Sequence, residues 1–226
     1  MYSVYHRARS YLFRLLDAKV GTEAKRMKYF SSFVSGYSFD SVADLGCGKG
    51  LIYDSIASPD QTAPRIGIDL IKNNSKRYQH IVASAAKLPF RDNVFSLVTA
   101  FSLIEHIPKT ERAEFYKEAR RVMRERGAFV IQFPNRYFVI ESHTFLPFFG
   151  FLPSRMHSFA YRREYVAIPS LKEVTRSLEK HGFKRFSTEK YGGSFLPFPR
   201  FLNRTGFFSI WPMGYVVHTR KSEASD

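Results

Sequence analysis

The sequence has little cysteine, few acidic side chains and no long apolar run. Its single cysteine among 226 residues excludes an intramolecular disulfide and favours a reducing compartment. No apolar run reaches the ~18 to 20 residues that a membrane-spanning helix needs. The first residues are basic and lack the apolar core of a signal peptide. We therefore expect a cytoplasmic protein that at most contacts a membrane at its surface.

Basic residues dominate the charge. Lysine and arginine number 35 against 20 acidic residues, which gives a formal net charge of +15. A field of this sign favours nucleic acid, an anionic lipid surface or a phosphorylated substrate as partner. Residues 1–35 are dense in basic side chains and carry apolar positions at near-helical spacing. We expect them to form a basic helical segment and residues 36–226 to form the main domain.

Strand and helix patterns alternate along the main domain. Helix patterns include one with Thr110 as its N-cap and Gly127 at its end, and another from Ser170 to Gly182. Short apolar or alternating runs predict the strands "SVADLG", "RIGIDL", "HIVAS", "FSLVTAFS", "AFVIQF", "FKRFSTEKY" and "YVVHTRK". This alternation is typical of an α/β fold with a mostly parallel sheet and helices on both faces.

Two stretches, residues 134–168 and 192–213, interrupt the alternation. Both are rich in proline and phenylalanine, and the first carries nine aromatic residues between Phe133 and Tyr161. Long loops in compact domains are usually functional or disordered, and this aromatic content argues against disorder. We expect both stretches to be insertions that form an aromatic-rich lid or substrate lobe.

A glycine-rich loop, "LGCGKG", follows the first predicted strand and opens a helix. Glycine lets the backbone approach a ligand closely, and the helix N-terminus adds aligned N–H groups. The spacing of Gly46, Gly48 and Gly50 is G-x-G-x-G, which matches neither the dinucleotide fingerprint nor a Walker A loop. Asp69 ends the second strand at about the ~20-residue offset where an acidic side chain meets ribose hydroxyls. The loop and Asp69 together predict a nucleoside site without a diphosphate.

These residues, with "AAKLPFRDNVFSLVTAFSLIEHI" and "RVMRERGAFVIQFPN", resemble class I S-adenosylmethionine-dependent methyltransferases of the type-11 group. The resemblance runs from about Val42 to Asn135 and implies a Rossmann-like fold with a seven-stranded sheet. It implies S-adenosylmethionine as cofactor and S-adenosylhomocysteine as product. The three glycines would approach the methionine part, Asp44 would hold its amino group and Asp69 the ribose. Further cofactor contacts are implied for Leu70, Ser84, Ala85, Phe101 and Ser102.

Two serines depart from the family's pattern. Ser84 stands where the family usually has an acidic residue for the adenine amine, although serine can still accept one hydrogen bond. Ser96 replaces an aspartate that is usually structural, so we infer no loss of function. Cys47 lies in the cofactor loop and is not expected to act as a nucleophile, and we expect no metal site.

Three side chains are candidates for a catalytic role. His106, in "LIEHIP", lies near the expected acceptor, but in the family this position usually supports the loop. Glu141 and His143 are two residues apart, so in an extended loop both side chains share one face. A carboxylate that orients an imidazole is a general-base arrangement. The same pair also suits a polar latch of the lid or half of a metal site.

The aromatic lobe indicates the class of methyl acceptor. It suits a small or lipid-like molecule with an anionic part, methylated on oxygen, nitrogen or carbon. An RNA acceptor is the alternative, because bases stack on aromatic rings and arginines bind phosphates. The arginines available for that role are Arg155, Arg162, Arg163, Arg200 and Arg204. A third reading is a non-catalytic cofactor-binding adaptor, and the sequence predicts no oligomeric state.

Overall fold

The computed structural model describes residues 29, 32–35, 39–50, 64–72, 78–138, 148–151, 166–192 and 205–221. Most of the predicted basic segment, the helix predicted after the glycine loop, and most of both predicted insertions lie outside these residues. The boundaries at residues 35, 134–168 and 192–213 therefore stay predictions. Glu141 and His143 also lie outside the described residues.

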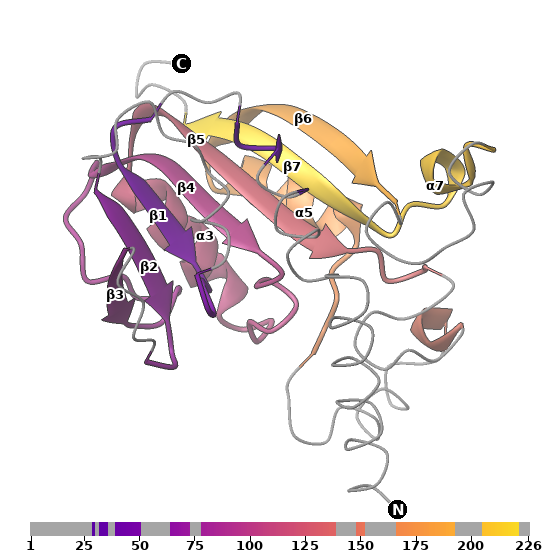
Figure 1. The fold of residues 1–226 in the computed structure, drawn as a ribbon, viewed down its shortest axis with the longest axis horizontal. Helices are drawn as coiled ribbons and strands as arrows, with labels where there is room; N and C mark the ends of the chain where they lie inside the picture. Colours follow the sequence, from indigo (N-terminus) through magenta and orange to yellow (C-terminus); the bar gives the residue numbers. More distant parts are fainter. Residues whose placement is uncertain are drawn as a thin grey trace, which may run out of the picture.

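A seven-stranded sheet forms the centre of the fold (Figure 1), in the order β3-β2-β1-β4-β5-β7-β6. Neighbouring strands from β3 through β5 are parallel, and β7 runs antiparallel between β5 and β6. The mostly parallel sheet is therefore confirmed. The strands are β1 (Val42–Leu45), β2 (Arg65–Asp69), β3 (Gln79–Val82), β4 (Phe95–Phe101), β5 (Met123–Pro134), β6 (Phe183–Tyr191) and β7 (Gly214–Lys221).

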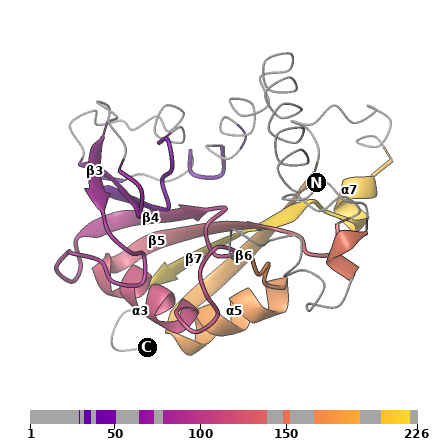
Figure 2. The ribbon, with the colours of Figure 1, turned by 90° about the horizontal axis from the view of Figure 1, so that it is seen from below.

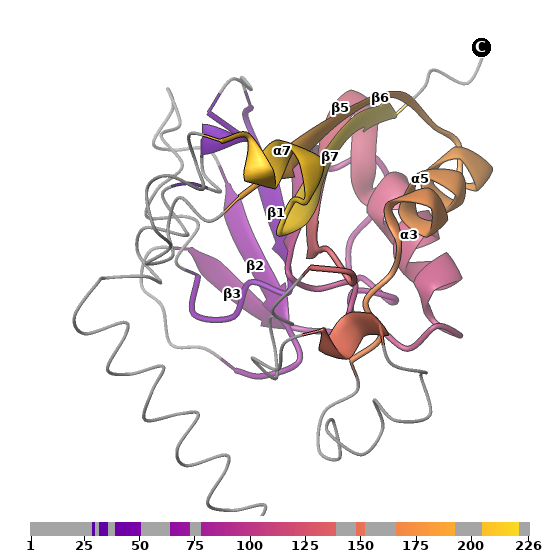
Figure 3. The ribbon, with the colours of Figure 1, turned by 90° about the vertical axis from the view of Figure 1, so that its right-hand side faces the viewer.

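Two helices, α3 (Arg112–Val122) and α5 (Leu171–Lys180), cover one face of the sheet (Figure 2). The short helix α7 (Phe207–Ile210) and the 3-10 helix η1 (Phe149–Phe151) lie beyond the carboxyl end of β5 (Figures 1 and 3). The helices predicted for the opposite face lie outside the described residues. Within the described part of the chain, no helix is long and apolar enough to cross a membrane.

Helix α3 is shorter than the sequence pattern predicts. Its N-cap residue is Glu111 rather than Thr110, and no side chain makes the capping hydrogen bond. The helix ends at Val122 rather than at Gly127, because Met123 is fully buried and pairs with Phe95 in the sheet. Burial in the sheet thus overrides the helix propensity of the charged residues that follow.

Helix α5 begins where it was predicted. The side chain of Ser170 accepts a hydrogen bond from the backbone of Glu173, whose carboxylate accepts one from the backbone of Ser170. This reciprocal pair is a capping box, which satisfies two donors that the helix leaves unpaired. Val174 and Leu178 are fully buried, so the helix is anchored by its cap and its apolar face.

Alternating side chains along the strands build two apolar cores. On β5, Phe129 and Ile131 belong to the core that α3 and α5 cover, whereas Val130 belongs to the other. This follows from the two-residue period of a strand. The second core also contains Phe33 and Val34, so the described end of the predicted basic segment packs onto the sheet.

Ser96 has the structural role expected of the residue that it replaces. Its hydroxyl accepts hydrogen bonds from the N–H groups of Asp40 and Ser41, at 3.1 and 3.2 Å. It also donates to the Ser41 carbonyl at 3.0 Å. A serine therefore fixes the chain that enters β1 against the start of β4.

Candidate functional site

The carboxyl ends of β1, β2 and β4 meet at one edge of the sheet, because these strands are adjacent and parallel. The glycine loop follows β1, Asp69 ends β2, and Ser102 follows β4. Ligands of open α/β sheets bind outside the carboxyl ends of the strands. Three of the predicted groups of cofactor residues therefore converge at the expected place, which we call the cofactor edge.

The glycines of the loop have different surroundings, although all three have positive φ angles. A Cβ atom on Gly46 would lie 2.7 Å from Cδ1 of Leu103, and one on Gly50 would overlap the ring of Tyr78. At Gly48 nothing lies within 4 Å of such an atom. Gly46 and Gly50 thus allow packing inside the protein, whereas Gly48 faces open space that a ligand can occupy.

Asp69 links the second strand to the glycine loop. Its Oδ2 accepts a hydrogen bond of 2.9 Å from the N–H of Gly48, and its Oδ1 accepts one of 3.0 Å from Ile71. Each carboxylate oxygen has a further lone pair, so the group can still accept hydrogen bonds from hydroxyl groups. Leu70, which follows, is 72% exposed at the same edge. Asp69 therefore fixes the loop and keeps the capacity to hold ribose hydroxyls.

Asp44 is a buried carboxyl group on β1. Only 3% of the residue is exposed, and its Oδ1 accepts a 2.7 Å hydrogen bond from the hydroxyl of Thr99 on β4. Burial raises the pKa of Asp44 to about 7, the hydrogen bond from Thr99 opposes this rise, and the charge of Asp69 adds to it. A cationic amino group placed here would be attracted to the ionised carboxylate.

Cys47 stays a thiol inside the loop. It is buried, and burial together with the negative charges of Asp44 and Asp69 raises its pKa to about 12. The thiolate is the nucleophilic form of cysteine, and it is disfavoured here. This environment agrees with the expectation that Cys47 has no nucleophilic role.

Ser84 forms a tight turn after β3. Its hydroxyl accepts from the N–H of Ala86 at 3.2 Å, and its carbonyl accepts from Lys87 at 3.0 Å. The N–H of Ala83 donates to the carbonyl of Asp69 at 3.1 Å, which attaches the turn to the end of β2. Ser84 and the partly buried Ala85 thus lie next to Asp69, where the adenine end is expected.

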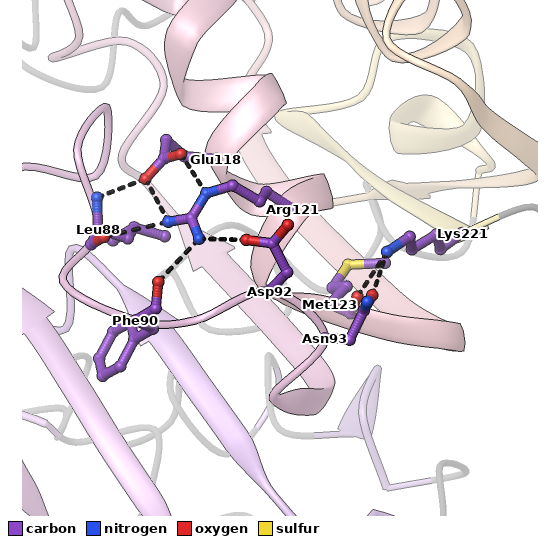
Figure 4. A network of polar contacts seen from close by, with 8 residues as sticks. All are labelled: Leu88, Phe90, Asp92, Asn93, Glu118, Arg121, Met123 and Lys221. Atoms are coloured by element: carbon purple, nitrogen blue, oxygen red, sulfur yellow. Dashed lines mark hydrogen bonds and ion pairs between the residues drawn. The ribbon is translucent and has the colours of Figure 1, made fainter.

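Helix α3 holds the loop that leaves this turn (Figure 4). Arg121 donates hydrogen bonds to the carbonyls of Leu88 and Phe90, at 3.1 and 2.7 Å. It also pairs with Asp92 at 2.8 Å and with Glu118 at 2.6 Å. The carboxylate of Glu118 in turn accepts from the N–H of Leu88 at 2.7 Å. Two side chains of α3 therefore fix the backbone of this loop.

The turn after β4 closes over the glycine loop. Ser102 has a φ of 51° and donates from its hydroxyl to Oε1 of Gln132 on β5 at 2.9 Å. Phe101 packs against the second core, and Leu103 contacts Gly46. The hydroxyl of Ser102 is thus engaged with β5, and its backbone is the part that bounds the cofactor edge.

Glu105 and His106 differ in burial within the same turn. Glu105 is 1% exposed, and its carbonyl accepts from the N–H of Ala167 at 2.7 Å. His106 is exposed, and its N–H donates to the carbonyl of Leu103 at 2.8 Å. His106 therefore lies at the surface near the cofactor edge. Among the described residues, no group of three or more His, Cys, Asp or Glu side chains is suited to hold a metal ion.

Thr99, Tyr78 and Gln132 contribute to the site but could not be predicted from the sequence. Thr99 reads as an ordinary strand residue, and only the register of β1 and β4 places it opposite Asp44. Tyr78 fills the space behind Gly50, a contact between segments far apart in sequence. No local signal marks either contact.

Residues 43–131 match the family described as "Methyltransferase domain". This match and the seven-stranded fold confirm the resemblance. The matched part of the chain is a methyltransferase domain. A Mycobacterium tuberculosis H37Rv protein, named a probable S-adenosylmethionine-dependent methyltransferase, is 30% identical over 100 residues, 42% of this chain and 36% of the relative.

Two further proteins are similar to this chain. The ubiquinone biosynthesis O-methyltransferase of Nitrosomonas europaea is 25% identical over 114 residues, 45% of this chain and 47% of the relative. A SAM-dependent methyltransferase from Archaeoglobus fulgidus shares the fold, with a TM-score of 0.60 and 16% identity over 92% of this chain and 99% of that chain. The chain covers less than half the length of the curated relatives that it matches.

The groups at the cofactor edge fit S-adenosylmethionine. Gly48 leaves open space at the loop, and Asp69 keeps free acceptor capacity beside it. Asp44 supplies a carboxyl group whose ionised form a cation would stabilise. These three features suit a nucleoside that carries a methionine amino group.

Proposed function

We propose that the protein transfers a methyl group from S-adenosylmethionine to an oxygen, nitrogen or carbon of a small or lipid-like acceptor. The observation that carries this proposal is the convergence of Asp44, Gly48 and Asp69 at the cofactor edge. Gly48 would approach the methionine part, Asp44 would hold its amino group, and Asp69 would hold the ribose. The surrounding contacts would come from Gly46, Gly50, Leu70, Ser84, Ala85, Phe101 and Ser102.

When bound, the cofactor would supply an electrophilic methyl group for transfer to the acceptor's lone pair, with S-adenosylhomocysteine as the product. The protein mainly has to align the acceptor with this methyl group. Where the acceptor carries a proton, a base removes it. His106, exposed near the cofactor edge, and the Glu141–His143 pair are the proposed bases or substrate contacts.

The aromatic side chains favour an apolar acceptor. Tyr137, Phe148 and Phe151 follow the carboxyl end of β5, on the same edge of the sheet as the glycine loop. The similarity to a ubiquinone biosynthesis O-methyltransferase adds support for a lipid-like molecule. Arginine-rich sequence around these aromatics suits an anionic part of that acceptor.

Methyl-labelled S-adenosylmethionine tests the proposal. The protein is incubated with the labelled cofactor and an extract of its source cells, and lipid, RNA, protein and small-molecule fractions are counted. We expect label in the lipid or small-molecule fraction, lost in Asp69→Ala but kept in Glu114→Ala, which removes an exposed carboxylate of α3. Label in RNA would replace the proposed acceptor class. Tight cofactor binding without label in any fraction would favour an adaptor.

A further inference from the structure

Aromatic side chains from two distant parts of the chain meet at the surface beyond the carboxyl end of β5. The ring centroid of Phe151 lies 5.4 Å from that of Tyr137, 6.3 Å from that of Phe148 and 6.4 Å from that of Trp211. The indole N–H of Trp211 donates to the carbonyl of Tyr137 at 2.6 Å. This bond joins the segment after β5 to the end of α7. We call these four residues, Tyr137, Phe148, Phe151 and Trp211, together with the exposed Ile210 that precedes Trp211 in the chain, the aromatic surface cluster.

The aromatic surface cluster is open to solvent. Tyr137 is 47% exposed, Phe148 56%, Phe151 54% and Ile210 85%. Large apolar side chains gathered at a surface mark a site of interaction with a protein or a membrane. Phe148 also has a φ of 58°, a conformation that a bulky residue rarely adopts. A side chain that is both strained and exposed contributes little to folding, so its position points to an external contact.

Arg136 and the charge of the sequence indicate which partner the cluster would bind. The guanidinium carbon of Arg136 lies 5.7 Å from the centroid of the Tyr137 ring. The two stretches that supply the cluster, residues 134–168 and 192–213, carry six arginines and two glutamates in sequence. The whole chain has a formal net charge of +15. Aromatic and arginine side chains in combination are typical of surfaces that enter the headgroup region of anionic bilayers.

We propose that the aromatic surface cluster docks the protein onto an anionic lipid surface. The aromatic and apolar side chains would enter the headgroup region, while Arg136 and the net charge would attract the anionic lipids. The link to catalysis rests on the proposed function: the carboxyl end of β5 lies on the same edge of the sheet as the glycine loop. Docking would therefore present the cofactor edge to a lipid-like acceptor.

Trp211 makes the test direct, because it is the single tryptophan of the chain. The full-length protein is mixed with phosphatidylcholine vesicles, with or without phosphatidylglycerol, in the absence of cofactor and acceptor. We expect co-sedimentation and a blue shift of tryptophan emission only with phosphatidylglycerol. Phospholipids brominated near the headgroup end of their acyl chains should quench the emission of Trp211. Equal behaviour with both vesicle types, or no binding to either, would overturn the proposal.

Two variants test the cluster itself. Ile210→Glu replaces the most exposed side chain of the cluster by an acidic one. Phe148→Asn removes a ring and introduces a residue that tolerates the positive φ at this position. Each should weaken vesicle binding by about tenfold, the loss expected for one large apolar side chain, without lowering the melting temperature. Val82→Thr is the matched control, because Val82 is also 56% exposed but lies on β3.

The outcomes separate docking from catalysis. If both cluster variants bind vesicles as tightly as the unmodified protein, the proposal is overturned. It is also overturned if the protein binds no vesicles but self-associates in size-exclusion chromatography and Ile210→Glu abolishes this self-association. Cofactor binding is measured separately by calorimetry. Asp69→Ala should bind vesicles as the unmodified protein does, so failure of the proposed function would leave this test intact.

Discussion

The hydroxyl of Thr99 on β4 donates a 2.7 Å hydrogen bond to Oδ1 of Asp44, its direct neighbour on β1. Both residues are buried, and this bond stabilises the ionised carboxylate in a place where burial disfavours it. Because the pKa of Asp44 is about 7, a modest change in this bond decides how much carboxylate is present at neutral pH. Thr99 is thus a positioning residue for the proposed amino-group contact.

Replacing Thr99 by valine should weaken cofactor binding at neutral pH by about tenfold, since one hydrogen bond to a charged group is lost. The pKa of Asp44 should rise further, so the affinity should recover as the pH is made alkaline. Calorimetric titration with S-adenosylhomocysteine over a pH series measures this. Thr99→Ser keeps the hydroxyl and should behave as the unmodified protein does. An unchanged pH profile in Thr99→Val would contradict the role given to this bond.

Asp44 should also make the stability of the cofactor-free protein depend on pH. Its folded-state pKa of about 7 lies above the ordinary value of 3.8, so the folded protein holds a proton that the unfolded chain releases. The stabilisation from this group is full below about pH 4 and is lost as the pH rises through about 7. Asparagine cannot ionise, so Asp44→Asn should not lose stability in this pH range. We expect its melting temperature to exceed that of the unmodified protein by about 3 °C or more above pH 7. An equal difference at acidic and alkaline pH would contradict this assignment.

The glycine loop offers a matched pair of substitutions. Gly50→Ala would drive a methyl group into the ring of Tyr78, and we expect a loss of about 2 kcal/mol or more in the free energy of unfolding. Gly48→Ala meets no atom within 4 Å, so only its positive φ opposes it, at roughly 1 kcal/mol. Gly48→Ala should instead lose most of the cofactor affinity. Denaturant titration and calorimetry measure the two effects. Similar affinity for Gly48→Ala and the unmodified protein would show that no ligand approaches Gly48.

Arg121 and Lys117 on α3 provide a second matched pair. Arg121→Met removes bonds to two loop carbonyls and two carboxylates, with an expected loss of about 1 to 3 kcal/mol. Lys117→Met removes an exposed pair with Glu114, and its effect should be within about 0.5 kcal/mol. Denaturant titration compares them. If both variants lose the same stability, the clamp on the loop contributes nothing beyond a surface ion pair.

The histidine assignment is tested by separating turnover from binding. His143→Ala should reduce turnover by about 100-fold or more, as expected for loss of a general base, with little change in cofactor affinity. An equal loss of both, with a lower melting temperature, would instead indicate a latch. His106→Ala is the comparison, because that exposed side chain lies near the cofactor edge. A larger loss of turnover there would move the role of base to His106.

Local patterns predicted most of the described fold. The strands could be recognised from short apolar runs, and Ser170 marked the start of α5 because an N-cap serine is a local signal. The end of α3 was missed for the opposite reason. Met123 leaves the helix because it pairs with Phe95, and that pairing depends on a residue far away in sequence.

The candidate site also combines residues that local sequence patterns reveal with contacts that only the folded sheet creates. Gly48 and Asp69 lie in recognisable sequence positions, and the structure brings them into a 2.9 Å hydrogen bond. Thr99 is one threonine in a strand, and its contact with Asp44 depends on the register between strands. Sequence therefore predicted the residues that carry ligand-facing groups, whereas the neighbours that set their ionisation required the assembled sheet.

The clamp formed by Arg121 and Glu118 determines when the loop after Ser84 becomes ordered. The backbone of Leu88 and Phe90 is already held by α3 in the folded chain. The loop therefore loses its conformational freedom during folding rather than during ligand binding. A cofactor that binds beside this preorganised loop does not have to order it. Weakening the contacts of Arg121 should therefore make the entropy of cofactor binding less favourable, although Arg121 itself is placed in no cofactor contact.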